Sequence, residues 1–341
     1  MPSVRLLYIG GTGIISSACL DLAVERGHEV WVLNRGHTQK LPMPDGVKRL
    51  VADLADVEAV RAALGEESFD VVVQWIGYTP DQIARDVALF TGRTKQYVFI
   101  SSATVYQKPP PHYRISEART PLANPYWEYA QNKIACENLL GDARNAGFPV
   151  TIVRPSHTYG LTQIPACLSS WERPYTIVDR MRRGAPIIVP GDGTSLWTVT
   201  HNSDFAVGLV GLLGHPGAIG EAVHITSDEV LPWNDIYATI GQAAGVTPRI
   251  LHVPTDALVA ADPGLLGTLW GDKSHSTVFD TTKIRTLVPE FAPVVAFSDG
   301  MRATVEWFDA DPARQLVDEP VNALCDRVAE VYLDALARVA P

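Results

Sequence analysis

Hydrophobic residues in the first half of the chain gather in short, nearly unbroken runs separated by stretches of helical pattern. The runs are Val4–Ile9, Glu29–Leu33, Val47–Val51, Val71–Trp75, Tyr97–Ser101 and Val150–Val153. Continuous apolar runs of this length are typical of strands in a parallel sheet that helices cover on both faces. Helices are predicted at Ile14–Arg26, closed by Gly27, and at Pro125–Leu140, capped by Asn124 and closed by Gly141. The alternation predicts an α/β fold, a doubly wound parallel sheet of the Rossmann type.

The pattern changes after about Gly160, where proline and glycine become frequent and the regular alternation ends. A chain of 341 residues is long enough for roughly two domains of about 150 residues each. We therefore predict a dinucleotide-binding domain at residues 1–160, to which segments near 200–228 and 275–285 return. Residues 161–200 and 229–341 are predicted to form a smaller mixed α/β domain that binds the substrate.

Composition and charge restrict the partners of the chain. It has 46% hydrophobic and 19% charged residues, and its 28 Lys+Arg against 38 Asp+Glu give a net charge of −10. This acidic balance disfavours nucleic acid as a partner, and no apolar run approaches the ~18 residues that a membrane span needs. The four cysteines lie far apart without C-x-x-C spacing, which indicates a reducing compartment. We expect a cytoplasmic protein that binds neither nucleic acid nor membrane, and no metal site.

A glycine-rich segment joins the first predicted strand to the first predicted helix. It reads Gly10-Gly11-Thr12-Gly13-Ile14-Ile15-Ser16. The glycines allow a tight turn and a close approach of the backbone, so that N–H groups at the helix N-terminus can face a pyrophosphate. The position of the segment inside a strand–turn–helix unit predicts a dinucleotide site that includes Gly10, Thr12, Gly13, Ile14 and Ile15.

The end of the second predicted strand bears on the choice of cofactor. It reads Asn34-Arg35-Gly36, with no acidic residue to hold the ribose 2′-hydroxyl of NAD. Arg35 can pair with a 2′-phosphate, which favours NADP over NAD, although a solvated arginine stacked on adenine is the alternative. Asp53 and Leu54, after the third strand, are expected beside the adenine; the alternative for Asp53 is a helix N-cap.

A candidate catalytic set follows from two further segments. Tyr129 and Lys133 are four residues apart on a predicted helix and therefore share a face. A nearby ammonium favours the phenolate, so Tyr129 can exchange a proton during catalysis. Ser101 and Ser102 follow the fifth strand at the sheet edge where ligands bind, and a hydroxyl there can polarise a carbonyl. The alternative for both serines is a strand-end turn.

These segments together resemble an extended short-chain dehydrogenase/reductase of the NAD-dependent epimerase/dehydratase type. The resemblance covers nearly the whole chain and includes the glycine-rich loop, Asp53-Leu54, the segment Ser101–Tyr106 and the helix with Tyr129 and Lys133. It implies that Tyr129 is the acid/base, that Lys133 orients the nicotinamide ribose, and that Ser102 assists at the carbonyl. It further implies cofactor contacts at Ile76, Gly77, Ser101, Pro155 and His157, and pairing as a homodimer.

The chain also departs from the pattern of that family. Ala103-Thr104 stand where dehydratases carry Asp-Glu, so we expect no water elimination. Trp197 stands where nucleotide-sugar enzymes place an arginine for the pyrophosphate, which makes a nucleotide-sugar substrate doubtful. Substrate contacts are expected at Ser102, Ala103, Thr104, Tyr129, His157 and Trp197. For His157, a hydrogen-bonded loop histidine is the favoured alternative. His201 and Trp171 are further candidates for the pocket wall, with core packing the favoured interpretation of Trp171.

The leading hypothesis is an NAD(P)-dependent oxidoreductase or epimerase that moves hydride at a hydroxyl or carbonyl of a sugar-like or other small polar substrate. One alternative is a UDP- or TDP-sugar 4-epimerase proper. A subgroup with a similar Asn34-Arg35-Gly36 ending includes the chloroplast stem-loop RNA-binding proteins. The second alternative is therefore a cofactor-binding protein without turnover, for example an RNA binder.

Overall fold

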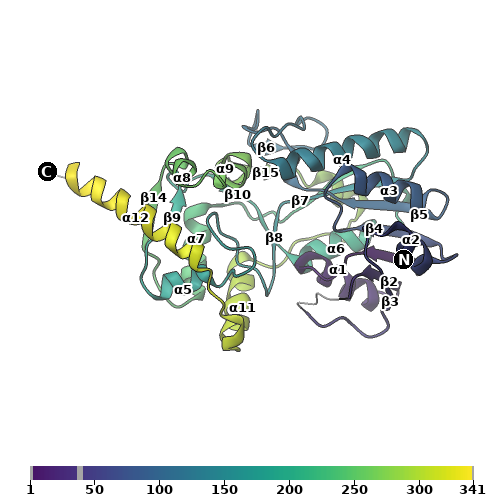
Figure 1. Cartoon of the computed structure of the whole chain (residues 1–341), viewed down its shortest axis with the longest axis horizontal. Coiled ribbons are helices and arrows are strands. Elements are labelled where there is room, and N and C mark those ends of the chain that lie inside the picture. Colours follow the sequence, from purple (N-terminus) through teal and green to yellow (C-terminus); the bar gives the residue numbers. More distant parts are fainter. Residues whose placement is uncertain (1–2, 37–40, 340–341) are drawn as a thin grey trace.

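The computed structural model describes residues 3–36 and 41–339, and a seven-stranded parallel sheet forms the core of its N-terminal part, on the right in Figure 1. Its strands are β1 (Arg5–Ile9), β2 (Glu29–Asn34), β3 (Lys48–Val51), β4 (Phe69–Gln74), β5 (Thr94–Ile100), β7 (Val150–Pro155) and β12 (Ala222–Ile225). They lie in the order β12-β7-β5-β4-β1-β2-β3, so the strand order reverses beside β1. The predicted fold class is confirmed, and the first six strands coincide with the six predicted runs.

Apolar side chains cover both faces of this sheet, as the unbroken runs predicted. On β1, Leu6 and Tyr8 face one buried cluster, whereas Leu7 and Ile9 face another. The helices α1 (Ile14–Glu25), α6 (Asn202–Leu212) and α10 (Thr282–Leu287) pack on the first face. The helices α2 (Val57–Leu64), α3 (Pro80–Phe90) and α4 (Glu128–Asn145) cover the second. The sheet is therefore a rigid platform whose carboxyl edge is left for ligands.

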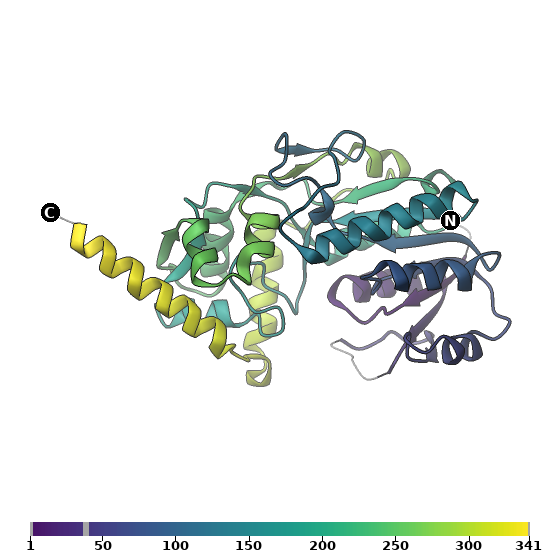
Figure 2. The same cartoon turned by 45° about the horizontal axis from the view of Figure 1, so that its top comes forward.

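A second body of helices and short strands lies beyond that edge (Figure 2). It contains α5 (Thr176–Arg182), β9 (Ile187–Pro190), β10 (Leu196–Trp197), β13 (Leu231–Pro232), α7 (Trp233–Ala243), β14 (Ile250–Val253), α8 (Thr255–Ala261), α9 (Leu265–Thr268), a π-helix η3 (Leu269–Lys273), α11 (Phe297–Asp309), the 3₁₀ turn η4 (Pro312–Arg314) and α12 (Glu319–Val339). Its buried cluster includes Trp197, Trp233 and Phe308. None of the described helices is both long and apolar enough to cross a membrane.

Short elements connect the two bodies. They are η1 (Ala103–Val105), β6 (Arg114–Ile115), β8 (His157–Tyr159), β11 (Val199–His201) and β15 (Val278–Phe279). The 3₁₀ turn η2 (Pro216–Ala218) instead joins α6 to β12 within the sheet body. Strand β11 pairs with β8, and β15 pairs with β6. These two parallel pairs fasten the second body against the sheet at the place where the polar candidate residues are found.

The predicted limits of the long helix were wrong at both ends. Helix α4 begins at Glu128 and ends at Asn145, rather than spanning Pro125–Leu140. The amide of Asn124 does not cap it; its nitrogen donates to the carbonyl oxygens of Thr104 (2.8 Å) and Gly271 (2.7 Å). Gly141 does not end it, because a glycine in an open position of a helix is tolerated.

Candidate functional site

One cavity of about 1340 Å³ lies between the carboxyl edge of the sheet and the second body. Most of the predicted site residues line it: Gly10, Thr12, Gly13, Ile14, Ile15, Asn34, Arg35, Asp53, Leu54, Ile76, Ser101, Ser102, Ala103, Thr104, Tyr129, Lys133, Pro155, His157 and Trp197. Gly77 and His201 are not part of its wall. A volume above the roughly 300–1,000 Å³ of a pocket for one drug-sized ligand leaves room for a dinucleotide and a second molecule.

The glycine-rich loop forms one end of the cavity. Gly10 has φ +96°, and a Cβ atom there would lie 3.0 Å from the side chain of Ile76. Ser16 accepts a hydrogen bond from the N–H of Gly13 (2.9 Å). In the described part of the chain, the N–H groups of Ile14 and Ile15 have no acceptor, although they stand at the positive end of α1. These unpaired donors beside an open cavity fit the pyrophosphate of a dinucleotide.

The same end holds the residues predicted beside the adenosine. Asn34 accepts a hydrogen bond from the N–H of Gly36 (2.9 Å), which shapes the turn that presents Arg35 to the cavity. Asp53 accepts from the N–H of Ala55 (2.9 Å), so it shapes a turn; the N-cap of α2 is Asp56, three residues later. The structure therefore rejects the N-cap interpretation of Asp53 and leaves Asp53 and Leu54 in the cavity wall.

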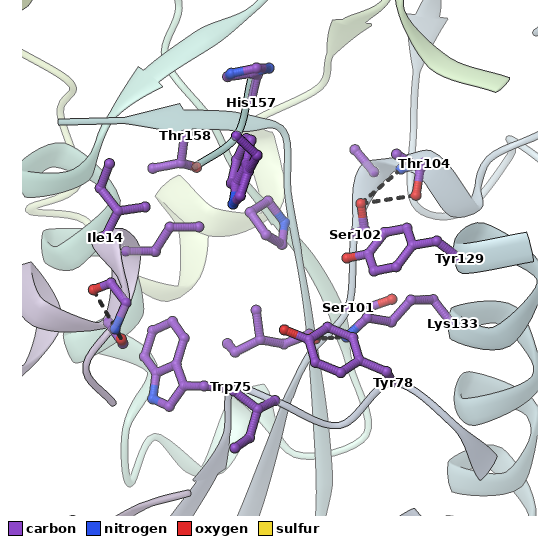
Figure 3. A pocket seen from close by; sticks show the side chains of 18 of the residues that line it. Ile14, Trp75, Tyr78, Ser101, Ser102, Thr104, Tyr129, Lys133, His157 and Thr158 are labelled. Carbon is purple, nitrogen blue, oxygen red and sulfur yellow. Dashed lines mark hydrogen bonds between the residues drawn. The ribbon is translucent and has the colours of Figure 1, made fainter. Parts of the chain in front are cut away.

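The predicted catalytic residues meet at the middle of the cavity (Figure 3). Ser102 and Tyr129 point toward one another, and Lys133 follows Tyr129 one turn further along α4. The Ser102 hydroxyl oxygen accepts hydrogen bonds from the N–H (3.2 Å) and the hydroxyl (3.0 Å) of Thr104. With both Thr104 donors directed at this oxygen, the Ser102 hydroxyl hydrogen is left to donate elsewhere, as an assisting group at a substrate oxygen must.

The electrostatics of this set differ from the sequence-based expectation. Burial raises the pKa of Tyr129 to about 12, with a further rise from Tyr78 and Asp272 and an opposing effect of the Ser102 hydroxyl. Burial also lowers the pKa of Lys133 to about 8. Burial therefore outweighs the lowering of the Tyr129 pKa that was expected from Lys133. The Lys133 ammonium lies 5.8 Å from the centroid of the Tyr129 ring and donates to the carbonyl oxygens of Gly77 and Ile100, both at 2.8 Å.

Ser101 has a structural partner of its own. Its hydroxyl donates to the carboxylate of Glu137 (2.5 Å), which is also bound by the Arg154 guanidinium at 3.0 and 2.5 Å. Arg154 donates in addition to the hydroxyl of Tyr106 at 2.8 Å. This buried network packs behind the cavity wall. Ser101 therefore contributes to the wall through its backbone, because its hydroxyl already donates to Glu137.

Aromatic residues form the opposite wall. Trp197 is buried and stacks on Trp233, with ring centroids 5.6 Å apart. His157 is half-buried, and the desolvation of its ring lowers its pKa to about 3, so its imidazole is neutral at neutral pH. Core packing was the wrong interpretation of Trp171, because this side chain is 60% exposed and lines the cavity.

Five charged residues of the cavity wall were not predicted from the sequence: Arg85, Lys108, Asp262, Asp272 and Lys273. Lys108 precedes Asp272 and Lys273 by 164 or more positions in the sequence. No sequence motif marks any of these residues. The π-helix that carries Asp272 and Lys273 is a type of element found often at functional sites. The one local signal in the sequence for this element is the Trp-Gly-Asp-Lys segment, which follows an apolar stretch.

Comparison with known proteins agrees with this geometry. Residues 6–226 match the NAD dependent epimerase/dehydratase family. The chain belongs to this family. It is 26% identical over 264 residues to the Arabidopsis thaliana chloroplast stem-loop binding protein of 41 kDa b, covering 73% of this chain and 65% of that protein. It is also 26% identical over 259 residues to the 2′-dehydrokanamycin reductase of Streptomyces kanamyceticus, covering 74% and 70%.

Solved structures of family members share the fold. The UDP-glucuronic acid 4-epimerase of Bacillus cereus, determined with UDP-glucuronic acid and NAD, superposes with a TM-score of 0.70 at 20% identity. The match covers 89% of this chain and 99% of that one. The seven-stranded sheet and the second body of this family member are thus an arrangement that elsewhere holds NAD.

Proposed function

We propose that this family member is an NAD(P)-dependent oxidoreductase that moves hydride at a hydroxyl or carbonyl carbon of a small polar, sugar-like substrate. The observation that carries the proposal is the placement of Ser102 and Tyr129 in the same cavity as the unpaired N–H groups of Ile14 and Ile15. A dinucleotide held at the loop supplies the hydride acceptor or donor that such a reaction requires.

The residues of the chain divide the remaining work. The Ser102 hydroxyl donates a hydrogen bond to the substrate oxygen, and Thr104 holds the serine in the required orientation. Tyr129 moves the proton between its phenol oxygen and the substrate oxygen. With a pKa of about 12, Tyr129 is protonated at neutral pH, which is the form that serves carbonyl reduction. Lys133 fixes the two strand ends by binding the Gly77 and Ile100 carbonyls.

Two observations support a redox reaction without water elimination on a substrate other than a nucleotide sugar. Ala103 and Thr104 offer no carboxyl group beside Ser102 to act as the acid of a dehydratase. Trp197, packed on Trp233, offers no charge to a pyrophosphate. A reductase exchanges its cofactor after each turnover, whereas an epimerase keeps it. We therefore treat retention of NAD(H) through purification as the measurement that separates these two outcomes.

The test of the function is the Tyr129→Phe variant, which keeps the ring and removes the proton donor. We expect reduction of polyhydroxy carbonyl compounds, followed by loss of NADH or NADPH absorbance, to fall by at least 10²-fold. The matched control is Tyr113→Phe, since Tyr113 is a half-exposed tyrosine outside the cavity wall. Unchanged turnover in Tyr129→Phe would refute both the reductase and the epimerase forms of the proposal.

NADP remains our proposal for the preferred cofactor, and it rests on Arg35 alone. The guanidinium lies in the cavity wall at the end of β2, where the 2′-position of a bound adenosine ribose is expected. The solved relatives that carry NAD leave this preference to be tested by direct binding.

A further inference from the structure

Two buried lysines reach the substrate end of the cavity, and the ammonium of one of them has no hydrogen-bonding partner among the described residues. Lys108 and Lys273 are 4% and 8% exposed, and both line the cavity. Within residues 3–36 and 41–339, the Lys108 ammonium makes no hydrogen bond or ion pair; it lies 5.9 Å from the ring centroid of Trp197. Lys273 bonds Asp272 at 3.1 Å. We name Lys108, Asp272 and Lys273 the lysine cluster; with both ammonium groups protonated, its net charge is +1.

The backbone fixes both lysines in place. The N–H of Lys108 donates to the carbonyl of Ala123 (2.9 Å), and the neighbouring amide of Asn124 donates to the carbonyl of Gly271 (2.7 Å). The carbonyl of Lys273 accepts from the indole N–H of Trp233 (3.0 Å). Residues 123–124 thus tie the segment after η1 to the π-helix, so the spacing of the two lysines is built into the fold.

The structure offers no reason internal to the protein for keeping Lys108 charged. Burial lowers the pKa of Lys108, and Lys273 lowers it further, whereas Asp272 acts in the opposite direction. An ammonium group in this position destabilises the folded chain relative to an apolar side chain of similar size. Costly groups of this kind, facing a cavity without a partner, gather at ligand sites.

We propose that Lys108 and Lys273 bind a carboxylate of the substrate, so that the substrate is a small hydroxy acid or keto acid of sugar or polyol type. This inference rests on the proposed function and names its substrate class. The two ammonium groups supply donors to the carboxylate oxygens, and Asp272 holds Lys273 in position. The Trp197 ring, stacked on Trp233, closes the apolar side of this subsite.

Charge and position favour a carboxylate over other anions. The net charge of +1 on the lysine cluster is matched by one carboxylate, whereas a phosphate monoester or a diphosphate brings about two or more negative charges into the same space. Asp262, another acid of the cavity wall, adds a negative charge that further disfavours a multiply charged anion. The subsite lies in the same cavity as the reacting centre, because the lysine cluster lines this cavity together with Ser102 and Tyr129. The anion therefore belongs to the same small molecule that carries the reacting hydroxyl or carbonyl group.

Calorimetric titration of the protein saturated with NAD or NADP tests this proposal. D-gluconate and D-glucitol are matched probes, because they differ only by a carboxylate in place of a hydroxymethyl group. D-glucitol 6-phosphate and UDP are the phosphate arms. We expect D-gluconate to bind at least tenfold more tightly than D-glucitol, and more tightly than either phosphate. Equal binding of the two matched probes, absence of gluconate binding, or tighter lysine-dependent binding of a phosphate would overturn the proposal.

The variants Lys108→Met and Lys273→Met locate the effect. Each is expected to weaken gluconate binding by at least tenfold and to leave glucitol binding unchanged. Lys95→Met, which removes the same charge from an 83% exposed side chain, is the control. Lys108→Met removes a buried unpaired charge, so its melting temperature is expected to stay level or rise, which separates loss of binding from loss of folding. Gluconate binding that survives both cavity substitutions would refute the assignment.

Because these titrations need no turnover, they separate the two proposals. Binding that depends on the lysines in the Tyr129→Phe variant supports the carboxylate subsite whatever the catalytic result. If turnover depends on Tyr129 but gluconate binding is unaffected by replacing the lysines, the oxidoreductase proposal is supported and the carboxylate subsite is refuted.

Discussion

The buried ion pair between Glu137 and Arg154 allows the sharpest test of how the cavity wall is supported. Its side chains are 3% and 6% exposed, and the guanidinium binds both carboxylate oxygens at 3.0 and 2.5 Å. Glu137→Gln keeps the size of the side chain but leaves the arginine charge buried without compensation. Breaking a buried pair in this way costs about 3–5 kcal/mol.

The expected shift in melting temperature follows from the size of the chain. An unfolding entropy of about 2.1 cal/mol/K per residue gives roughly 0.7 kcal/mol/K for the 341 residues. The loss therefore corresponds to a decrease of about 4–7 °C for Glu137→Gln, measured by calorimetry or near-UV circular dichroism at neutral pH.

A double variant separates the destabilisation caused by an unpaired buried charge from the net contribution of the ion pair to stability. Glu137→Leu combined with Arg154→Met removes both charges and retains apolar volume, so we expect it to recover most of the lost stability. The hydroxyls of Ser101 and Tyr106 each lose one partner, which accounts for the remainder. A Glu137→Gln protein that melts within 1 °C of wild type, or a double variant that melts as low as the single one, would refute this reasoning.

Two further predictions concern titration and cofactor choice. The pKa of Lys133 is about 8 in the folded protein and 10.5 in the reference state, so between these pH values the unfolded chain binds the extra proton and stability rises with pH. The Lys133→Met variant should lack about 3 kcal/mol of that rise in stability. Denaturant titrations at pH 7.5 and 10.5 measure the unfolding free energy of both proteins, and an equal change with pH in the two would contradict the prediction. Arg35→Ala should lower the affinity for NADP relative to NAD at least tenfold by calorimetry, with Arg61→Ala, on the exposed side of α2, as the control. An unchanged ratio would favour an arginine that only stacks on adenine.

Local pattern was sufficient for the sheet and the cofactor end. Strand runs such as Val71–Trp75 are buried on both faces, and in that case hydrophobicity alone marks the strand. The glycine-rich loop and the Tyr129–Lys133 spacing are also local features, since each lies within one turn or one helix. The positions of the strands and of these residues could therefore be predicted from neighbours in the sequence.

Long-range contacts decided what the sequence could not predict. Asn124 has the right residue type and position for a helix cap, but its amide binds two distant carbonyls, at Thr104 and Gly271. Tertiary bonds therefore outcompeted a local preference of about 1 kcal/mol. Trp171 looked like core from its residue type, yet its surroundings leave it 60% exposed. The lysine cluster is of the same kind, since its members meet only after the π-helix docks on the segment after η1.

Lys133 and Lys108 show two different ways to bury a lysine in one cavity, and the difference bears on function. Lys133 is 1% exposed, and two carbonyl oxygens at 2.8 Å satisfy its ammonium, so its place is explained within the fold. Lys108 is almost as buried, but within the described residues its ammonium has no hydrogen bond or ion pair; it lies 5.9 Å from the centroid of the Trp197 ring, and the charge of Asp272 opposes the lowering of its pKa. The unfavourable free energy of burying this ammonium is offset only when an anion binds beside it. Stability and binding should consequently move in opposite directions when Lys108 is replaced by methionine, whereas at Lys133 they should fall together, because its removal also frees the carbonyls of Gly77 and Ile100.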